Sequence, residues 1–265
     1  MKGHRIVLSF FVTLVALWGV APATAHAQLP GCSVADFVLL GERAQYDVAA
    51  NNSIFLKTRV VSGRSYHVMA WGPFGGGTNG EDDIDISVGL FTDATCTTPA
   101  QTVSTTAFEP EPNAPGHVGA QASLIPTATG PLYIQVHNNT ASAAPLQAII
   151  VETTLFSPWW FTGGTNQAFI EVTNNMDTAT TAVVTVRKAD GSTCGTSNVP
   201  LAAGGNAAVS VKALGTCANA SGSAQIAFNG TPGGLTANTT TIDGIQGTSF
   251  DSPFVPRMTW SLLAR

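Results

Sequence analysis

Charged side chains are scarce in this sequence. Aspartate, glutamate, lysine and arginine make up only 10% of the 265 residues, whereas hydrophobic residues make up 44%. Disordered chains combine low hydrophobicity with high charge, so this balance excludes a disordered protein. The formal net charge is -5, so the chain also lacks the basic excess that binds nucleic acid or an anionic membrane. We therefore expect an ordered protein with no nucleic-acid partner.

The polar residues that favour helices are also few. The chain has four lysines and six glutamates against 33 threonines. Lysine and glutamate suit helix surfaces, whereas threonine suits the half-buried faces of strands. This composition predicts an all-β fold.

Long apolar runs are absent except at the N-terminus. Lys2 and Arg5 precede the apolar run 6–18, and small residues follow as far as Ala27. These are the three parts of a secretory signal peptide, so we expect residues 1–27 to be removed and the protein to be periplasmic or extracellular. The run is shorter than the roughly 20 residues of a spanning helix, which predicts no transmembrane segment in the mature chain. Removal of the signal takes the formal net charge from -5 to -7.

The four cysteines form no C-x-x-C motif. An exported chain with four cysteines most simply makes two structural disulfides, and the spacing favours Cys32 with Cys96 and Cys194 with Cys217. The alternative is lipidation of Cys32, because residues 29–32 loosely resemble a lipoprotein cleavage box. Lipidation would leave an odd thiol, so we favour two disulfides.

Short alternating apolar runs separated by Gly-, Asn- and Pro-rich breaks predict strands along the whole chain. In the run 84–91, Ile84, Ile86, Val88 and Leu90 should share one inward face. The expected strands are 54–61, 65–71, 84–91, 118–125, 131–137 and 146–153, and then 166–173, 180–187, 207–212, 223–228, 235–242 and 254–262. We interpret them as two β-sandwich modules, 28–154 and 155–265, that meet near Ser157-Pro158 without a flexible linker.

Catalytic motifs are missing. No serine lies in the G-x-S-x-G pattern of elbow-type hydrolases, and His67, His117 and His137 do not have zinc-site spacing. Glu109 and Glu111 flank prolines and are interpreted as loop acids. We expect no enzyme, although a triad assembled from distant loops remains an alternative.

The segment 75–80 satisfies G-x-G-x-x-G, but acidic residues and a strand follow it instead of a helix, so we interpret it as a surface loop. The acids Glu81, Asp82, Asp83 and Asp85 offer oxygen ligands for a structural calcium ion, and a solvated acidic loop is the interpretation that we favour. No other cofactor is expected.

Aromatic residues are densest at 156–161, where Trp159 and Trp160 stand between two phenylalanines. Such rings could stack on a sugar or a partner, or fill the interface between the modules, and we favour the interface. Consecutive residues of a strand point to opposite faces, so one tryptophan could pack while the other stays available. Trp159 and Trp160 are therefore the candidate binding residues.

Three segments of the first module, 63–68, 83–91 and 130–136, follow by pattern, and not as strict motifs, the strands G-x-x-Y, D-x-D-x-x-L and G-x-Y-x-x-V. Val88 stands where the second pattern has leucine, and Tyr133 comes one residue later than the third pattern has it. Over roughly residues 35–154 the chain thereby resembles the bacterial pre-peptidase C-terminal domain. The resemblance implies a noncatalytic, jelly-roll-like accessory domain, linked in some relatives to polymer binding, to secretion of a neighbouring enzyme or to calcium. Residues 1–34, which precede this segment in the sequence, contain no peptidase domain. The second module resembles only immunoglobulin-like sandwiches in general.

These observations together predict a noncatalytic exported protein that binds an extracellular polymer or an envelope partner. Two alternatives remain: a structural component of the envelope that acts through protein contacts, and an unrecognised secreted hydrolase.

Overall fold

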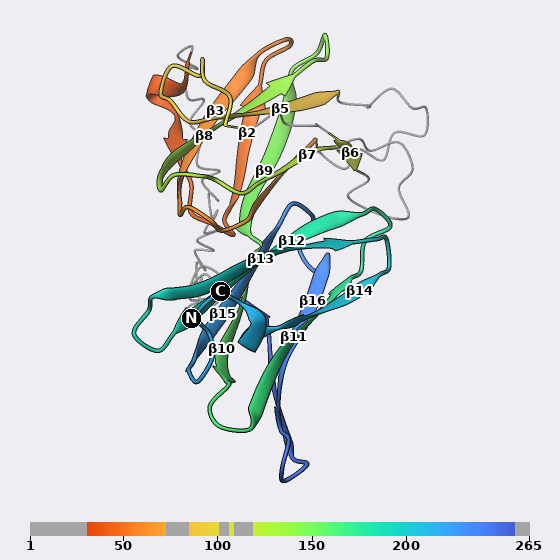
Figure 1. Ribbon diagram of the computed structural model, residues 1–265. Helices are drawn as coiled ribbons and strands as arrows, with labels where there is room; N and C mark the ends of the chain where they lie inside the picture. The colour runs from red at the N-terminus through yellow and green to blue at the C-terminus, as the bar shows by residue number, and fades with distance from the viewer. Residues whose placement is uncertain (1–30, 73–84, 101–105, 109–118, 258–265) are drawn as a thin grey trace, which may run out of the picture.

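The fold is all-β, as the composition predicts. The computed structural model describes residues 31–72, 85–100, 106–108 and 119–257, with the backbone alone for 106–108. Within these ranges the regular elements are strands and two short 3-10 helices, η1 (Cys32–Val34) and η2 (Val211–Ala213) (Figure 1). No helix of the described residues is long and apolar enough to cross a membrane.

Strands from the first half of the chain form two sheets around one apolar core. Ile86, Val88 and Leu90 point into this core, as the alternating pattern predicts, whereas Ile84 lies outside the described residues. One sheet has the order β1 (Asp36–Phe37), β3 (Ser53–Val60), β8 (Gly130–Asn138), β5 (Ile86–Phe91), and the other has the order β2 (Arg43–Val48), β9 (Ala144–Glu152), β4 (Tyr66–Trp71), β7 (Gly119–Leu124), β6 (Thr106–Phe108).

Strands from the second half form another pair of sheets around a separate core, which includes Trp160 and Phe228. One sheet has the order β13 (Thr193–Leu201), β12 (Thr180–Lys188), β15 (Ser221–Phe228), β10 (Leu155–Phe161), β18 (Val255–Pro256). The other has the order β14 (Asn206–Ser210), β11 (Asn166–Asn174), β16 (Leu235–Asp243), β17 (Ser249–Pro253). The link between the two halves is Thr153-Thr154, between the end of β9 and the start of β10. Ser157-Pro158, where we expected the modules to meet, lies inside β10.

A buried asparagine closes an equivalent connection in each half. Asn138 ends β8 and Asn174 ends β11; each strand has nine residues, and the next nine-residue strand lies in the opposite sheet. Asn138 Nδ2 donates to Ser142 O (2.9 Å), and Asn174 Nδ2 donates to Thr178 O (2.8 Å). In each case Oδ1 accepts the backbone N–H two residues on. In each turn, the buried asparagine side chain is thus the hydrogen-bond partner of a backbone carbonyl and a backbone N–H.

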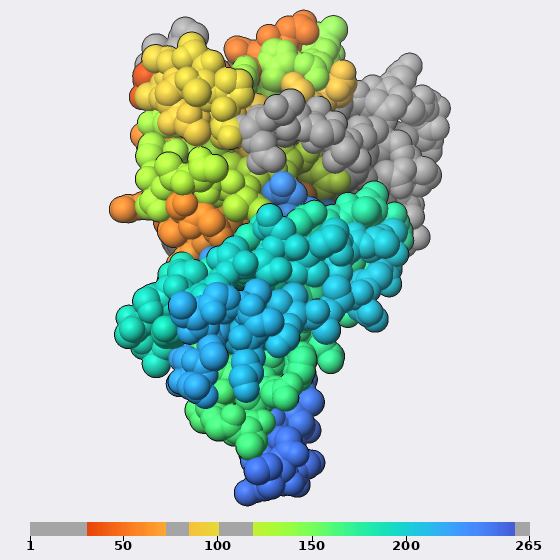
Figure 2. Space-filling model, viewed as in Figure 1, coloured from red at the N-terminus to blue at the C-terminus, as the bar shows by residue number. Residues whose placement is uncertain are grey.

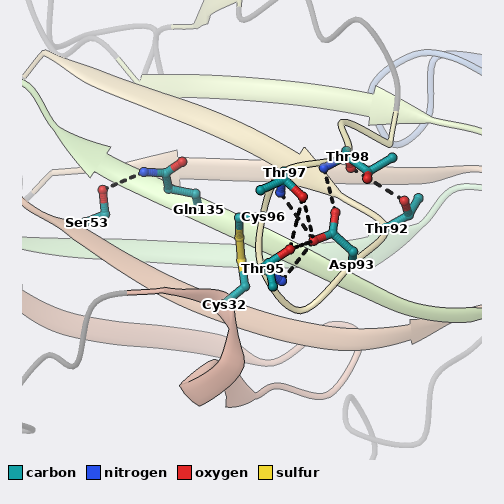
Figure 3. The surroundings of a disulfide bond; sticks show 9 residues. All are labelled: Cys32, Ser53, Thr92, Asp93, Thr95, Cys96, Thr97, Thr98 and Gln135. Atoms are coloured by element: carbon teal, nitrogen blue, oxygen red, sulfur yellow. Dashed lines mark hydrogen bonds between the residues drawn. A yellow bond between two sulfur atoms is a disulfide. The ribbon is translucent and has the colours of Figure 1, made fainter.

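Both predicted disulfides are present. Cys32 of η1 is bonded to Cys96 of the loop after β5 (Figure 3). Cys194 of β13 is bonded to Cys217. The loop that holds Cys96 is organised by Asp93, whose carboxylate accepts hydrogen bonds from Thr95, Thr97 and Thr98. These bonds, of which the Thr95 hydroxyl contributes most, hold the pKa of Asp93 below its usual range.

The two sandwiches lie against each other, as Figure 2 shows, and polar side chains contribute to the contact. Gln225 Nε2 donates to Gly63 O at 3.2 Å, and Ser123 Oγ donates to Gly230 O at 3.3 Å. Arg64 lies over the ring of Phe156, 5.5 Å from its centroid, and its guanidinium also pairs with Glu152 at 3.4 Å. Burial raises the pKa of the Glu152 carboxyl, and the Arg64 cation opposes that rise.

Candidate functional site

A β-bulge in β10 decides which tryptophan is exposed. Ser157 is paired with Ala224 and Trp160 with Gly222, so Pro158 and Trp159 together stand opposite Ser223. A bulge of this kind adds one residue to one strand and reverses the facing of the residues that follow. Without it, Trp159 would share the inward face of Leu155 and Ser157. The bulge instead turns Trp159 outward and Trp160 inward.

Trp160 is a core residue and not a surface binding residue. Its side chain is completely buried, and its indole Nε1 donates to Arg187 O (3.2 Å) and Ser223 O (3.0 Å). Buried indoles need such a partner. The prediction that Trp160 contacts a ligand is therefore wrong for this structure. Trp160 ties β10 to the backbones of β15 and β12 from inside the sandwich.

Trp159 belongs to a surface group of three aromatic rings, which we call the aromatic trio: Trp159, Phe161 and Phe250. Trp159 is 42% exposed and Phe250 61% exposed. The Trp159 and Phe161 rings are nearly parallel, 16° apart with centroids 6.4 Å apart, and the Phe250 ring stands at 87° to Trp159. We expected the aromatic residues of this segment to fill the interface between the modules. That prediction is wrong for Trp159, whose ring contacts are with Phe161 and Phe250 of the same module. Phe156 does lie at the interface, under Arg64 of the first module.

Gly163 positions one ring of the trio. A Cβ atom at this residue would lie 2.4 Å from Phe161 Cζ, which is far inside van der Waals contact. The Phe161 ring therefore lies over the Gly163 backbone, in the space that a side chain at 163 would occupy. A larger residue at 163 would displace the ring.

Polar side chains continue from the trio across the outer face of the sheet. Ser223 lies opposite the bulge, Arg187 is the neighbour of Ser223 on β12, and Thr193 is the neighbour of Arg187 on β13. We call Trp159, Ser223, Arg187 and Thr193 the polar row. Adjacent strands lie about 4.8 Å apart, so Arg187 is about 10 Å from the bulge. The row combines a ring, a hydroxyl and a cation on one half-exposed surface.

The guanidinium of Arg187 is held in place by neutral partners. Its Nη1 donates to Gly191 O at 3.4 Å and to Thr193 Oγ1 at 3.1 Å. Within the described ranges, the one salt bridge is that of Arg64 with Glu152, so Arg187 has no carboxylate partner there. A guanidinium carries five N–H donors, so most of its capacity faces away from these contacts.

The expected calcium site cannot be assembled from the described residues. Glu81, Asp82 and Asp83 lie outside them, as does the glycine-rich segment 75–80. Asp85 is exposed, and its Oδ1 accepts a hydrogen bond from Asn139 Nδ2 at 3.2 Å. Within the described ranges no group of three His, Cys, Asp or Glu residues could hold a metal ion.

Two histidines pair with serines. His67 Nδ1 lies 2.7 Å from Ser123 Oγ, and His137 Nδ1 lies 2.8 Å from Ser53 Oγ. In a catalytic triad a carboxylate orients the second ring nitrogen, but no described carboxylate is hydrogen-bonded to either histidine. Burial lowers the pKa of His67 to about 4, so its imidazole is neutral at pH 7. His117 lies outside the described residues, with Glu109 and Glu111.

Two open depressions occur near the turns of the second sandwich, with volumes of about 610 and 330 Å³. Alanine, threonine, proline, leucine and asparagine line the larger one, which has no ionisable side chain among its described residues. The smaller one has Asp177 as its ionisable residue. Neither brings together an acid and a base.

Sequence reasoning missed Phe250, Ser223 and Arg187. Phe250 reaches Trp159 from β17, which is far along the chain, and Arg187 reaches the row through the strand order β12-β15-β10. The one available signal was Pro158, because proline inside a strand often marks a bulge or an edge.

No protein-family model matches the chain, and no curated protein matches it in sequence. Among solved structures, it is similar to the adhesin domain of Epf from Streptococcus pyogenes. The two are 11% identical, and the match covers 81% of this chain and 75% of that one with a TM-score of 0.27. This low similarity supports no inference about function.

Proposed function

We propose that the protein is a noncatalytic exported binding protein whose second sandwich holds an extracellular or envelope polymer against the aromatic trio. The first module is then an accessory domain of the kind that its pre-peptidase C-terminal resemblance implies. The two disulfides support an oxidising compartment, because such bonds persist outside the cytosol.

The observation that carries this proposal is the exposure of Trp159. Large aromatic side chains usually bury their surface, and exposed rings that gather in one place mark interaction sites. Trp159, Phe161 and Phe250 come from two strands in different sheets and are held by the bulge and by Gly163. Their arrangement gives two nearly parallel rings with a third ring at right angles, and the exposed ring faces are available for stacking against sugar rings.

The test is cosedimentation of the mature protein with insoluble peptidoglycan, chitin and cellulose. We expect binding to at least one polymer, and we expect Trp159→Ala and Phe250→Ala to weaken it about tenfold or more, since stacking contacts of this type are worth over 1 kcal/mol. Gly163→Ala should weaken binding as well, because it displaces the Phe161 ring without removing it. Leu39→Ala is the matched control, since Leu39 is 53% exposed on the other sandwich.

The alternative function is a structural component of the envelope that acts through protein contacts. Failure to bind any polymer, together with loss of a crosslinked envelope protein in Trp159→Ala, would favour that alternative. Equal binding by Trp159→Ala and the wild-type protein would remove the aromatic trio as the site. A secreted hydrolase would require turnover that depends on His67, His117 or His137, which single substitutions to Gln would reveal.

A further inference from the structure

The outer face of the β10-β15-β12 sheet has an unusual charge for this chain. Side chains that alternate onto this face include Gln225 and Ser223 of β15 and Thr185 and Arg187 of β12. Of the residues that these three strands place on the face, Arg187 is the ionisable one. The chain as a whole carries a formal charge of -5. Arg64 of the first sandwich also lies over this face, above Phe156, but it is paired with Glu152. The Arg187 cation, about two strand spacings from the bulge, is therefore a local feature and not a consequence of a basic surface.

Asp190 lies near Arg187 in sequence but is engaged elsewhere. Its Oδ1 accepts hydrogen bonds from the backbone N–H and the hydroxyl of Ser192, and these contacts, with a smaller effect from the Lys188 cation, lower the pKa of Asp190. Arg187 instead contacts Gly191 O and Thr193 Oγ1, both neutral. These bonds orient the guanidinium and leave its charge without a counterion among the described residues.

Trp160 explains why the polar row is fixed. Its buried Nε1 bonds the carbonyls of both Arg187 and Ser223, so one indole beneath the sheet joins the two polar residues that face outward. Gly222 lets the β15 backbone lie close to Arg187 O, because a Cβ atom at residue 222 would be 1.9 Å from that oxygen. Trp160 is thus a positioning residue for the row, and Trp159 is the surface residue at its end.

On these observations we propose that the site of the proposed function is specific for an acidic polysaccharide. Sugar rings stack on Trp159 and Phe161, the Ser223 hydroxyl bonds a sugar hydroxyl, and Arg187 pairs with a carboxylate or sulfate group of the polymer. The span of about 10 Å between the bulge and Arg187, two strand spacings, corresponds to a short stretch of the glycan and not to a single sugar. The inference rests on the proposed function and narrows its ligand.

Charge complementarity favours an acidic polysaccharide over a neutral glycan and over a polyanion without sugar rings. A neutral glycan would leave the Arg187 charge uncompensated on a surface that the polymer partly desolvates, which costs free energy. An acidic group gives the guanidinium a charge-assisted partner, and the planar fork of arginine suits carboxylate and sulfate oxygens. A polyanion without rings would use Arg187 but leave the aromatic trio unused.

The experiment measures dissociation constants of the mature protein for four soluble polymers by affinity electrophoresis and calorimetry. Polygalacturonate carries carboxylates, dextran sulfate carries sulfates, dextran is the neutral polysaccharide, and polyglutamate carries carboxylates without sugar rings. We expect one of the two acidic polysaccharides to bind at least about tenfold more tightly than dextran and polyglutamate. The acidic polymer that binds identifies the source of the negative charge.

Variants then assign the contacts. Arg187→Gln should weaken binding to the acidic polysaccharide about tenfold and leave binding to dextran unchanged, and Arg187→Lys should recover part of the affinity because it keeps the charge. Lys212→Gln is the matched control, since Lys212 of η2 lies outside the face. Thermal unfolding of each variant verifies that the fold is intact.

The possible results separate this inference from the proposed function. Equal binding of dextran and the acidic polymers, unchanged in Arg187→Gln but lost in Trp159→Ala, overturns the inference and leaves the proposed function in place. Binding of polyglutamate as tight as that of polygalacturonate also overturns the inference, because ring stacking then contributes nothing. Binding to no polymer, soluble or insoluble, overturns both.

Discussion

Trp159 and Trp160 are neighbours in the sequence, yet Trp159 is 42% exposed and Trp160 is completely buried. Adjacent residues of a strand point to opposite faces, and the bulge at Pro158 and Trp159 decides that Trp160 is the one that points inward. Trp159 faces solvent at one end of the polar row. Trp160 donates hydrogen bonds to the backbone carbonyls of Arg187 and Ser223, which are two other members of that row. A contact surface and its internal support therefore come from adjacent residues.

Replacement of Trp160 should lower the free energy of unfolding far more than replacement of Trp159. Trp160→Phe removes a donor from two buried carbonyls and leaves a small cavity, so we expect a loss of about 2–4 kcal/mol in the free energy of unfolding. Trp159→Phe should stay within about 0.5 kcal/mol, as exposed substitutions usually do. Urea unfolding followed by circular dichroism measures both. Equal stability losses would contradict the assignment of Trp160 to the core.

Stability should fall in mild acid because of His67. Its pKa is about 4 in the folded protein, below its ordinary value of 6.5, because burial disfavours the charged imidazole. The unfolded chain therefore binds the proton more readily, so the contribution of His67 is fully present above pH 6.5 and is lost as the pH falls toward 4. The loss should approach about 3 kcal/mol, from the pKa difference. Urea midpoints at pH 7, 5.5 and 4 should show this slope in the wild-type protein and in His137→Gln, and a flatter slope in His67→Gln.

The buried asparagines at the two turns should be far more sensitive than the asparagines beside them. Asn174→Ala removes a buried side chain that donates to Thr178 O and Ala202 O and accepts from the Met176 N–H, and each such hydrogen bond is worth about 1 kcal/mol. Asn175 is exposed, and Asn175→Ala should cost under about 0.5 kcal/mol. Asn138→Ala and Asn139→Ala form the corresponding pair in the first sandwich. A similar unfolding midpoint for both members of a pair would show that the turn does not depend on the buried residue.

The bridge between Cys194 and Cys217 should stabilise the second sandwich. It spans 23 residues, for which loop-closure entropy gives roughly 3 kcal/mol. The double variant Cys194→Ala, Cys217→Ala should lower the urea midpoint accordingly, as followed by tryptophan fluorescence. An unchanged midpoint would mean that the bridge adds nothing to the free energy of unfolding.

The sequence predicts the fold better than the site, for a physical reason. Alternation is strong where one face of a strand is buried, so β5 and β16 could be found from local patterns. β2 and β13 lie at or near sheet edges and bury few apolar side chains, and no alternation marked them. The disulfides followed from the expected export and from the spacing of the cysteines, which do not depend on register.

The site depends on relationships that no local pattern encodes. Arg187 lies beside Ser223 only because β12 pairs with β15, and Ser223 lies beside Trp159 only because β15 pairs with β10. The facing of Trp159 depends further on one extra residue in β10. A register shift of one residue reverses every side chain of a strand, so the exposed tryptophan could not be chosen from the sequence alone.

The short link between β9 and β10 also gives the protein a mechanical axis. Tension on a polymer held at Trp159 would pass along β10 and through Thr153-Thr154 directly into β9. β9 is hydrogen-bonded on one side to β2 and on the other to β4, so the pull would load two ladders lengthwise instead of opening them one bond at a time. The chain path thus delivers force to an interior strand of the first sandwich.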